Sequence, residues 1–222
     1  HNQRRVSPLN HLVHSGGRSP LTEFARKVTR SDVQSIQSAE GVRRLFAQLG
    51  YRVQPEALPV DLDELELRPA DRPVVRGFHL LGDYGFDLLL GLFVLDDLSG
   101  TRLRSLAGAL LARSTSCLFV AADPEYRTLA VVNPRRLAPG KIKILKLLID
   151  RAQPTRHDLD ILNEITATGL STERIVDTHL RAFNVDRITK AFYLRYRELF
   201  DGLRKALKAN NRGIRQFQED NE

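Results

Sequence analysis

The segment 185–208 constrains the fold of this chain more than any other part, because its apolar residues recur every three or four positions. This spacing places them in one stripe along a single long helix. Asn184 is a favourable N-cap, and Asp186 lies in the first turn, where the helix dipole favours a carboxylate. The other faces of the helix are mainly basic. The stripe consists of Val185, Ile188, Phe192, Leu199, Leu203 and Leu207.

The start of this helix resembles the segment that precedes the methyltransferase domain of adenine-specific DNA methylases, including single-chain type IIG restriction–modification enzymes. In that family the segment often reads AF(D/N)VExVTKxFYxxYxxxF, and Asp186-Arg187 departs from the usual Glu-Lys pair. The likeness extends, as a weaker similarity of layout, over most of residues 38–209. The matching residues are Ala182-Phe183-Asn184-Val185, Ile188-Thr189-Lys190, Phe192-Tyr193 and Tyr196.

This resemblance implies that the chain is the N-terminal region of a DNA methylase or restriction–modification protein active in phage defence. Double-stranded DNA and a methylase catalytic domain, in cis or in trans, are the partners it implies. S-adenosylmethionine would be the cofactor of the parent protein. The chain itself has no Gly-x-Gly, and Asn133-Pro134-Arg135-Arg136 keeps only half of the (Asp/Asn)-Pro-Pro-(Tyr/Phe) loop that receives a flipped adenine. We therefore expect no cofactor here and interpret 133–136 as a loop with two exposed cations.

Composition is compatible with these expectations. A chain of 222 residues with 42% hydrophobic and 27% charged residues can bury the core of a globular domain. The net charge of +7 and the pI of about 9.8 suit a polyanionic partner. The only cysteine, Cys117, follows no disulfide pattern and lies in an apolar run, which indicates a buried structural thiol and a reducing cytoplasm. The apolar run 88–95 is too short to cross a membrane. The chain contains no methionine, so we expect it to be a piece of a longer protein.

The hydrophobic pattern divides the chain into three regions. Residues 1–37 form a polar N-terminal tail with a short helix near 21–29. Residues 38–152 form an α/β domain, and residues 153–222 form a helical C-terminal extension. Within the extension the pattern predicts helices over 158–168, 172–183 and 185–208.

The α/β region reads as helix, strand, strand-turn-strand, helix, strand over residues 38–122. Ser38 caps the first helix and Gly50 follows its end. Thr101 is expected to cap the second helix. The predicted sheet is mixed and flanked by helices, with a nearly apolar central strand. The predicted strands cover 51–53, 76–81, 86–95, 116–121, 129–132 and 141–149.

This order of elements is the core layout of PD-(D/E)xK nucleases, in which two acids hold a divalent metal and a lysine helps to activate water. The chain contains no Asp-x-Lys or Glu-x-Lys, and no lysine lies between Asp71 and Gly100. We therefore expect a degenerate, non-cleaving nuclease-like domain. An active Mg²⁺-dependent endonuclease using Asp83 and Asp87 remains an alternative, and so does a protein–protein or dimerisation module that would use the stripe of segment 185–208.

The basic residues carry the remaining functional signal, because lysine and arginine neutralise DNA phosphates irrespective of sequence. His179 is expected on a charged helix face with Glu173 and Asp177. Tyr193 and Tyr196 would sooner pack on neighbouring helices than stack on bases. The predicted DNA-binding residues are Arg135, Arg136, Lys141, Lys143, Lys190, Arg195, Arg197, Arg204, Lys205 and Lys208, and Lys146, Arg187, Arg212 and Arg215 belong to the same two basic groups.

Overall fold

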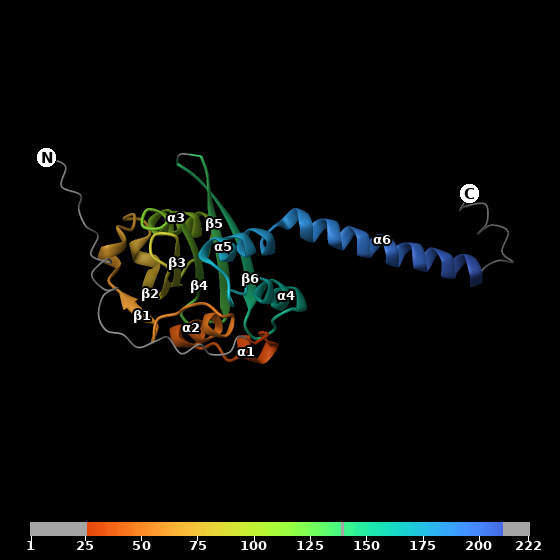
Figure 1. Cartoon of the computed structure of the whole chain (residues 1–222), viewed down its shortest axis with the longest axis horizontal. Helices are drawn as coiled ribbons and strands as arrows, with labels where there is room; N and C mark the ends of the chain where they lie inside the picture. The colour runs from red at the N-terminus through yellow and green to blue at the C-terminus, as the bar shows by residue number, and fades with distance from the viewer. Residues whose placement is uncertain (1–25, 139, 211–222) are drawn as a thin grey trace. The chain divides into compact units, whose positions relative to one another are not determined.

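The computed structural model of the chain describes residues 26–138 and 140–210, and it divides them into a compact unit that ends at Phe183 and a second unit that starts at Asn184 (Figure 1). Most of the predicted N-terminal tail lies outside the described residues, and residues 26–29, the described part of the short helix expected near 21–29, are not helical. In the described part the first helix is α1 (Arg30–Gln34), which is capped by Thr29. No helix in the described part is long and apolar enough to cross a membrane.

The compact unit is an α/β fold built on one mixed sheet of six strands in the order β1-β2-β3-β4-β5-β6. β3 and β4 are parallel and joined by helix α3 (Gly100–Leu111), and every other neighbouring pair is antiparallel. A parallel pair requires such a crossover connection, whereas the antiparallel pairs need only turns or short loops. The strands are β1 (Leu58–Val60), β2 (Val75–Asp83), β3 (Leu88–Leu95), β4 (Ser116–Ala122), β5 (Thr128–Ala138) and β6 (Lys141–Asp150).

One face of the sheet packs on α3. Leu103, Leu106 and Leu110 of this helix lie in the same buried cluster as Phe93 and Phe119 of the sheet. Phe93 also contacts a second core ring, Phe78, at a centroid distance of 4.6 Å. Cys117 belongs to this cluster, so the expected buried thiol is confirmed, and burial raises its pKa far above the usual value.

The opposite face is buried as well, since the alternate residues of the central strands are inaccessible to solvent. Helices α2 (Ala39–Gln48), α4 (Arg156–Glu164) and α5 (Thr172–Ala182) cover this side (Figure 1). Long-range hydrogen bonds tie them together: the Ala167 N–H donates to the Leu49 carbonyl oxygen, and Asn163 binds the backbone of Val28. The near-continuous apolar sequence of β3 follows from burial on both faces.

Several local expectations are confirmed. The Ser38 side chain accepts a hydrogen bond from the Gly41 N–H and begins α2, and Gly50 follows this helix with φ of 83°. β2 and β3 flank the expected turn. Two expectations are wrong: residues 51–53 form no strand, and Ser99, not Thr101, caps α3 by accepting a hydrogen bond from the Arg102 N–H.

The second unit contains helix α6 (Val185–Asn210), which spans the predicted segment 185–208. The side chains of residues 185–195, 208 and 210 lie outside the described residues. The described apolar side chains of this helix are exposed, with Leu199 at 71% and Leu203 at 60%. The helix therefore presents the apolar stripe predicted from its sequence along the part where side chains are described.

Candidate nucleic-acid interface

The end of the β5–β6 hairpin is a two-stranded ribbon. β4 pairs with β5 only as far as Val132, whereas β5 pairs with β6 onward to Ala138. The segment 133–138 consequently has a hydrogen-bonded neighbour on one side only. In Figure 1 the two strands rise together beyond the rest of the sheet. The expectation that 133–136 form a loop is therefore wrong: these residues lie in β5, where Pro134 is tolerated because the strand has become an edge.

Arg135 points to the side of the sheet that carries α5. Its guanidinium donates a hydrogen bond to the carbonyl oxygen of Leu180, in the last turn of α5, at 3.1 Å. Carbonyl oxygens at a helix C-terminus have no intrahelical donor, and the helix dipole favours a cation there. Partial burial lowers the pKa of Arg135 below its usual value. Lys143 lies directly across the ribbon from Arg135.

Arg136 points to the other side of the ribbon and makes an equivalent contact. Its guanidinium donates to the carbonyl oxygen of Leu111, the final residue of α3. Two successive arginines thus bind the C-terminal ends of two helices on opposite faces of the sheet. Arg136 is exposed overall and Arg135 is half-buried, so Arg136 keeps more of its surface available to a partner.

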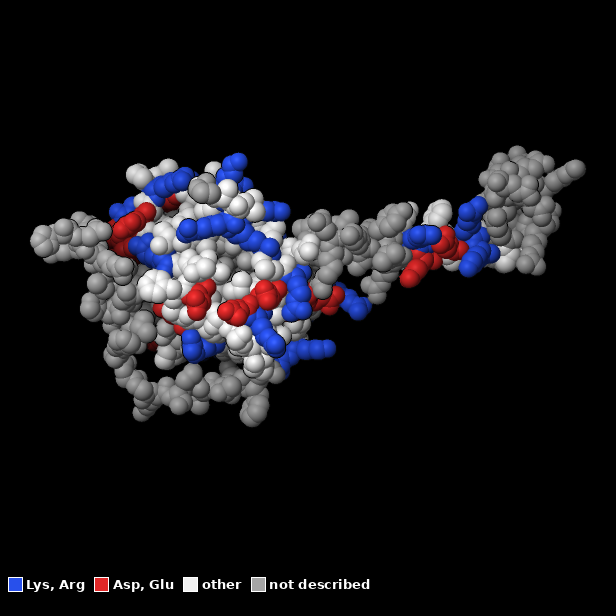
Figure 2. All heavy atoms as spheres, turned by 45° about the horizontal axis from the view of Figure 1, so that its top comes forward, with Lys and Arg blue, Asp and Glu red and all other residues white. Residues whose placement is uncertain are grey.

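The lysines of β6 are the most available cations of the hairpin. Lys141, Lys143 and Lys146 are exposed, and none pairs with a carboxylate among the described residues. Strand alternation and the register place Lys141 and Lys143 on the α5 side and Lys146 on the α3 side. Figure 2 shows lysine and arginine side chains gathered over the upper part of the compact unit, around the end of the hairpin. The hairpin therefore carries unpaired positive charge on both of its faces.

The predicted cations of α6 are only partly described. Arg197, Arg204 and Lys205 are exposed, and Arg197 lies 4.0 Å from Asp201 in an ion pair one helical turn away. An exposed pair of this kind leaves the arginine accessible to a stronger anion. Lys190, Arg195 and Lys208 belong to the same helix, but their side chains lie outside the described residues. α6 belongs to the second unit, whereas the hairpin belongs to the compact unit.

The two acids of the nuclease alternative flank the β2–β3 turn. Asp83 ends β2, is half-buried and has a pKa raised by burial, whereas Asp87 is exposed. Among the described residues no group of three or more His, Cys, Asp or Glu side chains could hold a metal ion. Mg²⁺ can be held by one or two carboxylates together with water and substrate phosphate. These two acids would supply such a minimal set, without the lysine of the nuclease motif.

A buried histidine was missed by reasoning from the sequence. His179 is 1% exposed, so the expectation that it lies on a charged helix face is wrong. Its Nε2 atom lies 2.6 Å from the Tyr51 hydroxyl, and that hydroxyl donates to the Ile165 carbonyl oxygen at 2.5 Å. Burial, and secondarily the charge of Arg135, lowers the pKa of His179 to about 4. This cluster fixes α5 against the end of α2 and has no access to a ligand.

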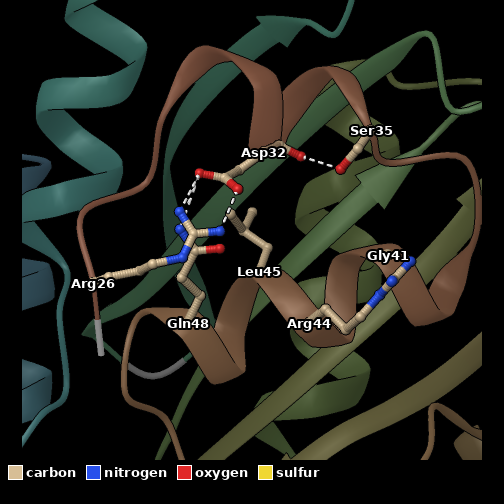
Figure 3. Close-up of a pocket in the computed structure, with 7 residues that line it drawn as sticks. All are labelled: Arg26, Asp32, Ser35, Gly41, Arg44, Leu45 and Gln48. Carbon is tan, nitrogen blue, oxygen red and sulfur yellow. Dashed lines mark hydrogen bonds and ion pairs between the residues drawn. The ribbon is translucent and has the colours of Figure 1, made fainter. Parts of the chain in front are cut away.

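A polar hollow of about 250 Å³ lies between α1 and α2 (Figure 3). Burial raises the pKa of Asp32 at its wall, but hydrogen bonds from Arg26, Thr29 and Gln48 outweigh this effect and hold that pKa well below its usual value. Arg44 lies at the other side of the hollow and points away from Asp32. The carboxylate of Asp32 is already hydrogen-bonded to Arg26 and Gln48 within the protein. The polar residues of the hollow therefore serve to join α1 to α2, not to hold a ligand.

The chain shows no significant match to any protein-family model, any curated protein or any solved structure. The resemblance to adenine-specific DNA methylases therefore remains a prediction from the sequence.

Proposed function

We propose that this chain is a DNA-binding or scaffolding region of a DNA methylase or restriction–modification protein and does no chemistry by itself. Duplex DNA would be held through its phosphates by the β5–β6 hairpin and by the basic faces of α6. The apolar stripe of α6 would brace a methylase domain in cis or in trans. S-adenosylmethionine would be bound by that methylase domain, since this chain lacks the glycine-rich loop that holds it.

One observation carries the proposal. Lys141 and Lys143 project from the protruding ribbon and Lys146 lies at its base, opposite Val132. None of the three pairs with a carboxylate among the described residues. Charged side chains at a surface usually have solvent or a counter-charge around them and contribute little. Unpaired lysines on a protruding two-stranded ribbon are expected to contribute more to binding, because they can approach a polyanion without first breaking ion pairs.

The order of elements supports the nuclease-like part of the proposal. From α2 to β4 the chain runs helix, strand, strand, strand, helix, strand, with an antiparallel three-strand meander followed by a parallel crossover. The expected PD-(D/E)xK layout has the same order. Because the chain lacks the acid-x-lysine motif of these nucleases, this order of elements favours a role in holding DNA over cutting it.

The test is a fluorescence-anisotropy titration of a duplex oligonucleotide at two salt concentrations, with and without Mg²⁺, followed by a gel of the product. Salt-sensitive binding with an intact duplex is the expected result. Magnesium-dependent nicking that disappears in Asp87→Ala would replace this proposal with the nuclease alternative. Absence of binding at low salt would remove DNA as the partner.

The exposed apolar residues of α6 favour a second candidate, a protein–protein or dimerisation module. Tyr196, Leu199, Phe200 and Leu203 are each more than half exposed. A contiguous exposed apolar patch of this kind usually marks a site of interaction with another protein or a membrane. Light scattering over a range of protein concentrations tests it: a mass that rises with concentration and falls back in Leu199→Glu/Leu203→Glu, without DNA affinity, would establish this candidate.

A further inference from the structure

The geometry of the hairpin points to a specific mode of binding. Resting on the proposed function, we propose that the end of the β5–β6 hairpin enters a groove of duplex DNA and inserts Leu137 between adjacent base pairs. The lysines and Arg136 would contact the phosphates on both sides of the groove. The ligand class is duplex DNA that can be unstacked locally.

Leu137 is 66% exposed at the end of a ribbon, and among the large apolar residues of the described compact unit only Phe86, in the β2–β3 turn, is more exposed. The residues next to it are Arg136 and Ala138, and Lys141 pairs with Ala138 across the ribbon. Gly140, two positions after Ala138, has a φ of 74°, a left-handed conformation that favours glycine. An apolar side chain is thus presented at the tip of a narrow element and flanked by cations.

The base of the ribbon is held on both faces. Arg135 is bonded to the end of α5 and Arg136 to the end of α3. Ile142 and Ile144 pack on α3, where a Cβ at Gly108 would make an ordinary contact of 3.5 Å with the Ile142 Cδ1 atom. A ribbon that is fixed in this manner loses little conformational entropy on binding. It is also rigid enough to bend the duplex.

The dimensions and charges suit a DNA groove. Two-stranded ribbons bind in the major or the minor groove, and proteins that insert apolar wedges between base steps from the minor groove unstack and kink the duplex. Unstacking costs a few kcal/mol per step and is offset by added contacts to the bent DNA. Lys141 and Lys143 lie on one face of the ribbon and Arg136 lies on the other, with Lys146 on that second face at the base, so the hairpin would meet a phosphate backbone on each side. A protein partner for Leu137 would instead need acidic residues around an apolar pocket.

The experiment uses a duplex that carries 2-aminopurine, whose fluorescence rises when its neighbours unstack, and a second duplex with fluorophores at both ends to report bending. Leu137→Ala is compared with Leu148→Ala, since Leu148 is also exposed but pairs with Ala130 inside the sheet. We expect wild type and Leu148→Ala to raise the fluorescence and shorten the end-to-end distance. Leu137→Ala should lose both signals, keep its salt dependence, and bind about tenfold more weakly.

The outcomes distinguish failure of the Leu137 insertion from failure of DNA binding as such. Salt-sensitive binding without unstacking or bending by the wild type would overturn the insertion of Leu137 and leave the proposed function standing. An equal effect of the two leucine substitutions would overturn it as well. No binding by the wild type at low salt would overturn both. Thermal unfolding of each variant confirms that a lost signal does not reflect a lost fold.

Discussion

Arg135 donates a hydrogen bond from its guanidinium to the carbonyl oxygen of Leu180, 3.1 Å away, and so links strand β5 to the last turn of helix α5. The two residues are 45 positions apart in the chain. Arg136 repeats the arrangement with Leu111 at the end of α3. The two arginines, which the sequence analysis predicts to bind DNA, thus also join two helices to the sheet.

Replacement of Arg135 tests this structural role. Arg135→Met retains the aliphatic stem but leaves the Leu180 carbonyl oxygen without its donor, and we expect a loss of about 1–2 kcal/mol in the free energy of unfolding. Urea denaturation with an unchanged m-value measures it. Lys143→Met, directly across the ribbon, is the control because its ammonium is exposed. Equal stability of the two variants would contradict the role given to the Arg135–Leu180 bond.

The buried His179 predicts a dependence of stability on pH. Its pKa is about 4 in the folded chain, against an ordinary value of 6.5. Between these values the unfolded chain takes up a proton that the folded chain excludes. The contribution of His179 to the free energy of unfolding is therefore fully present above pH 6.5. It falls by about 3 kcal/mol in total as the pH drops toward 4.

Urea denaturation of wild type and His179→Gln over pH 4–7 isolates this effect, because carboxylates titrate equally in both proteins. We expect the wild type to lose its advantage over the variant as the pH falls. A difference between the two that stays constant over this range would mean that His179 does not titrate as its burial requires.

Gly91 in β3 predicts a packing requirement. A Cβ at this position would lie 2.6 Å from Cε2 of Phe78, a fully buried core ring. Gly91→Ala should therefore force the ring or the strand to move and cost about 1–3 kcal/mol. Gly77→Ala in the paired strand β2 is the matched control, because the nearest atom to its Cβ is 3.8 Å away, at His79. Thermal unfolding of both variants should show a drop in Tm for Gly91→Ala alone.

Local chemistry made part of this fold predictable. The Ser38 cap, the αL conformation of Gly50 and the long helix α6 are set by residues a few positions apart, and reading the sequence located them. The apolar run of β3 likewise indicated a strand buried on both faces. Each of these signals lies within one element.

Long-range contacts account for what was missed. Pro134 suggested a loop, but β4 stops pairing at Val132, so β5 continues as an edge strand that accommodates a proline. His179 is surrounded in sequence by charged residues, yet its partner Tyr51 lies 128 positions away. The carbonyl partners of Arg135 and Arg136 lie 45 and 25 positions away. No pattern within one segment contains this information.

The most direct test of the account compares two charge-matched variants in duplex binding. Lys141→Ala/Lys143→Ala removes two cations from the hairpin, and Lys27→Ala/Arg30→Ala removes two exposed cations at α1, at the opposite end of the unit (Figure 1). Fluorescence anisotropy over a range of salt concentrations gives the slope of log affinity against log salt. We predict that the magnitude of this slope is smaller by about 2 in Lys141→Ala/Lys143→Ala than in the wild type. The slope of Lys27→Ala/Arg30→Ala should equal that of the wild type. Identical slopes for the two variants would contradict the assignment of the hairpin as the DNA-binding element.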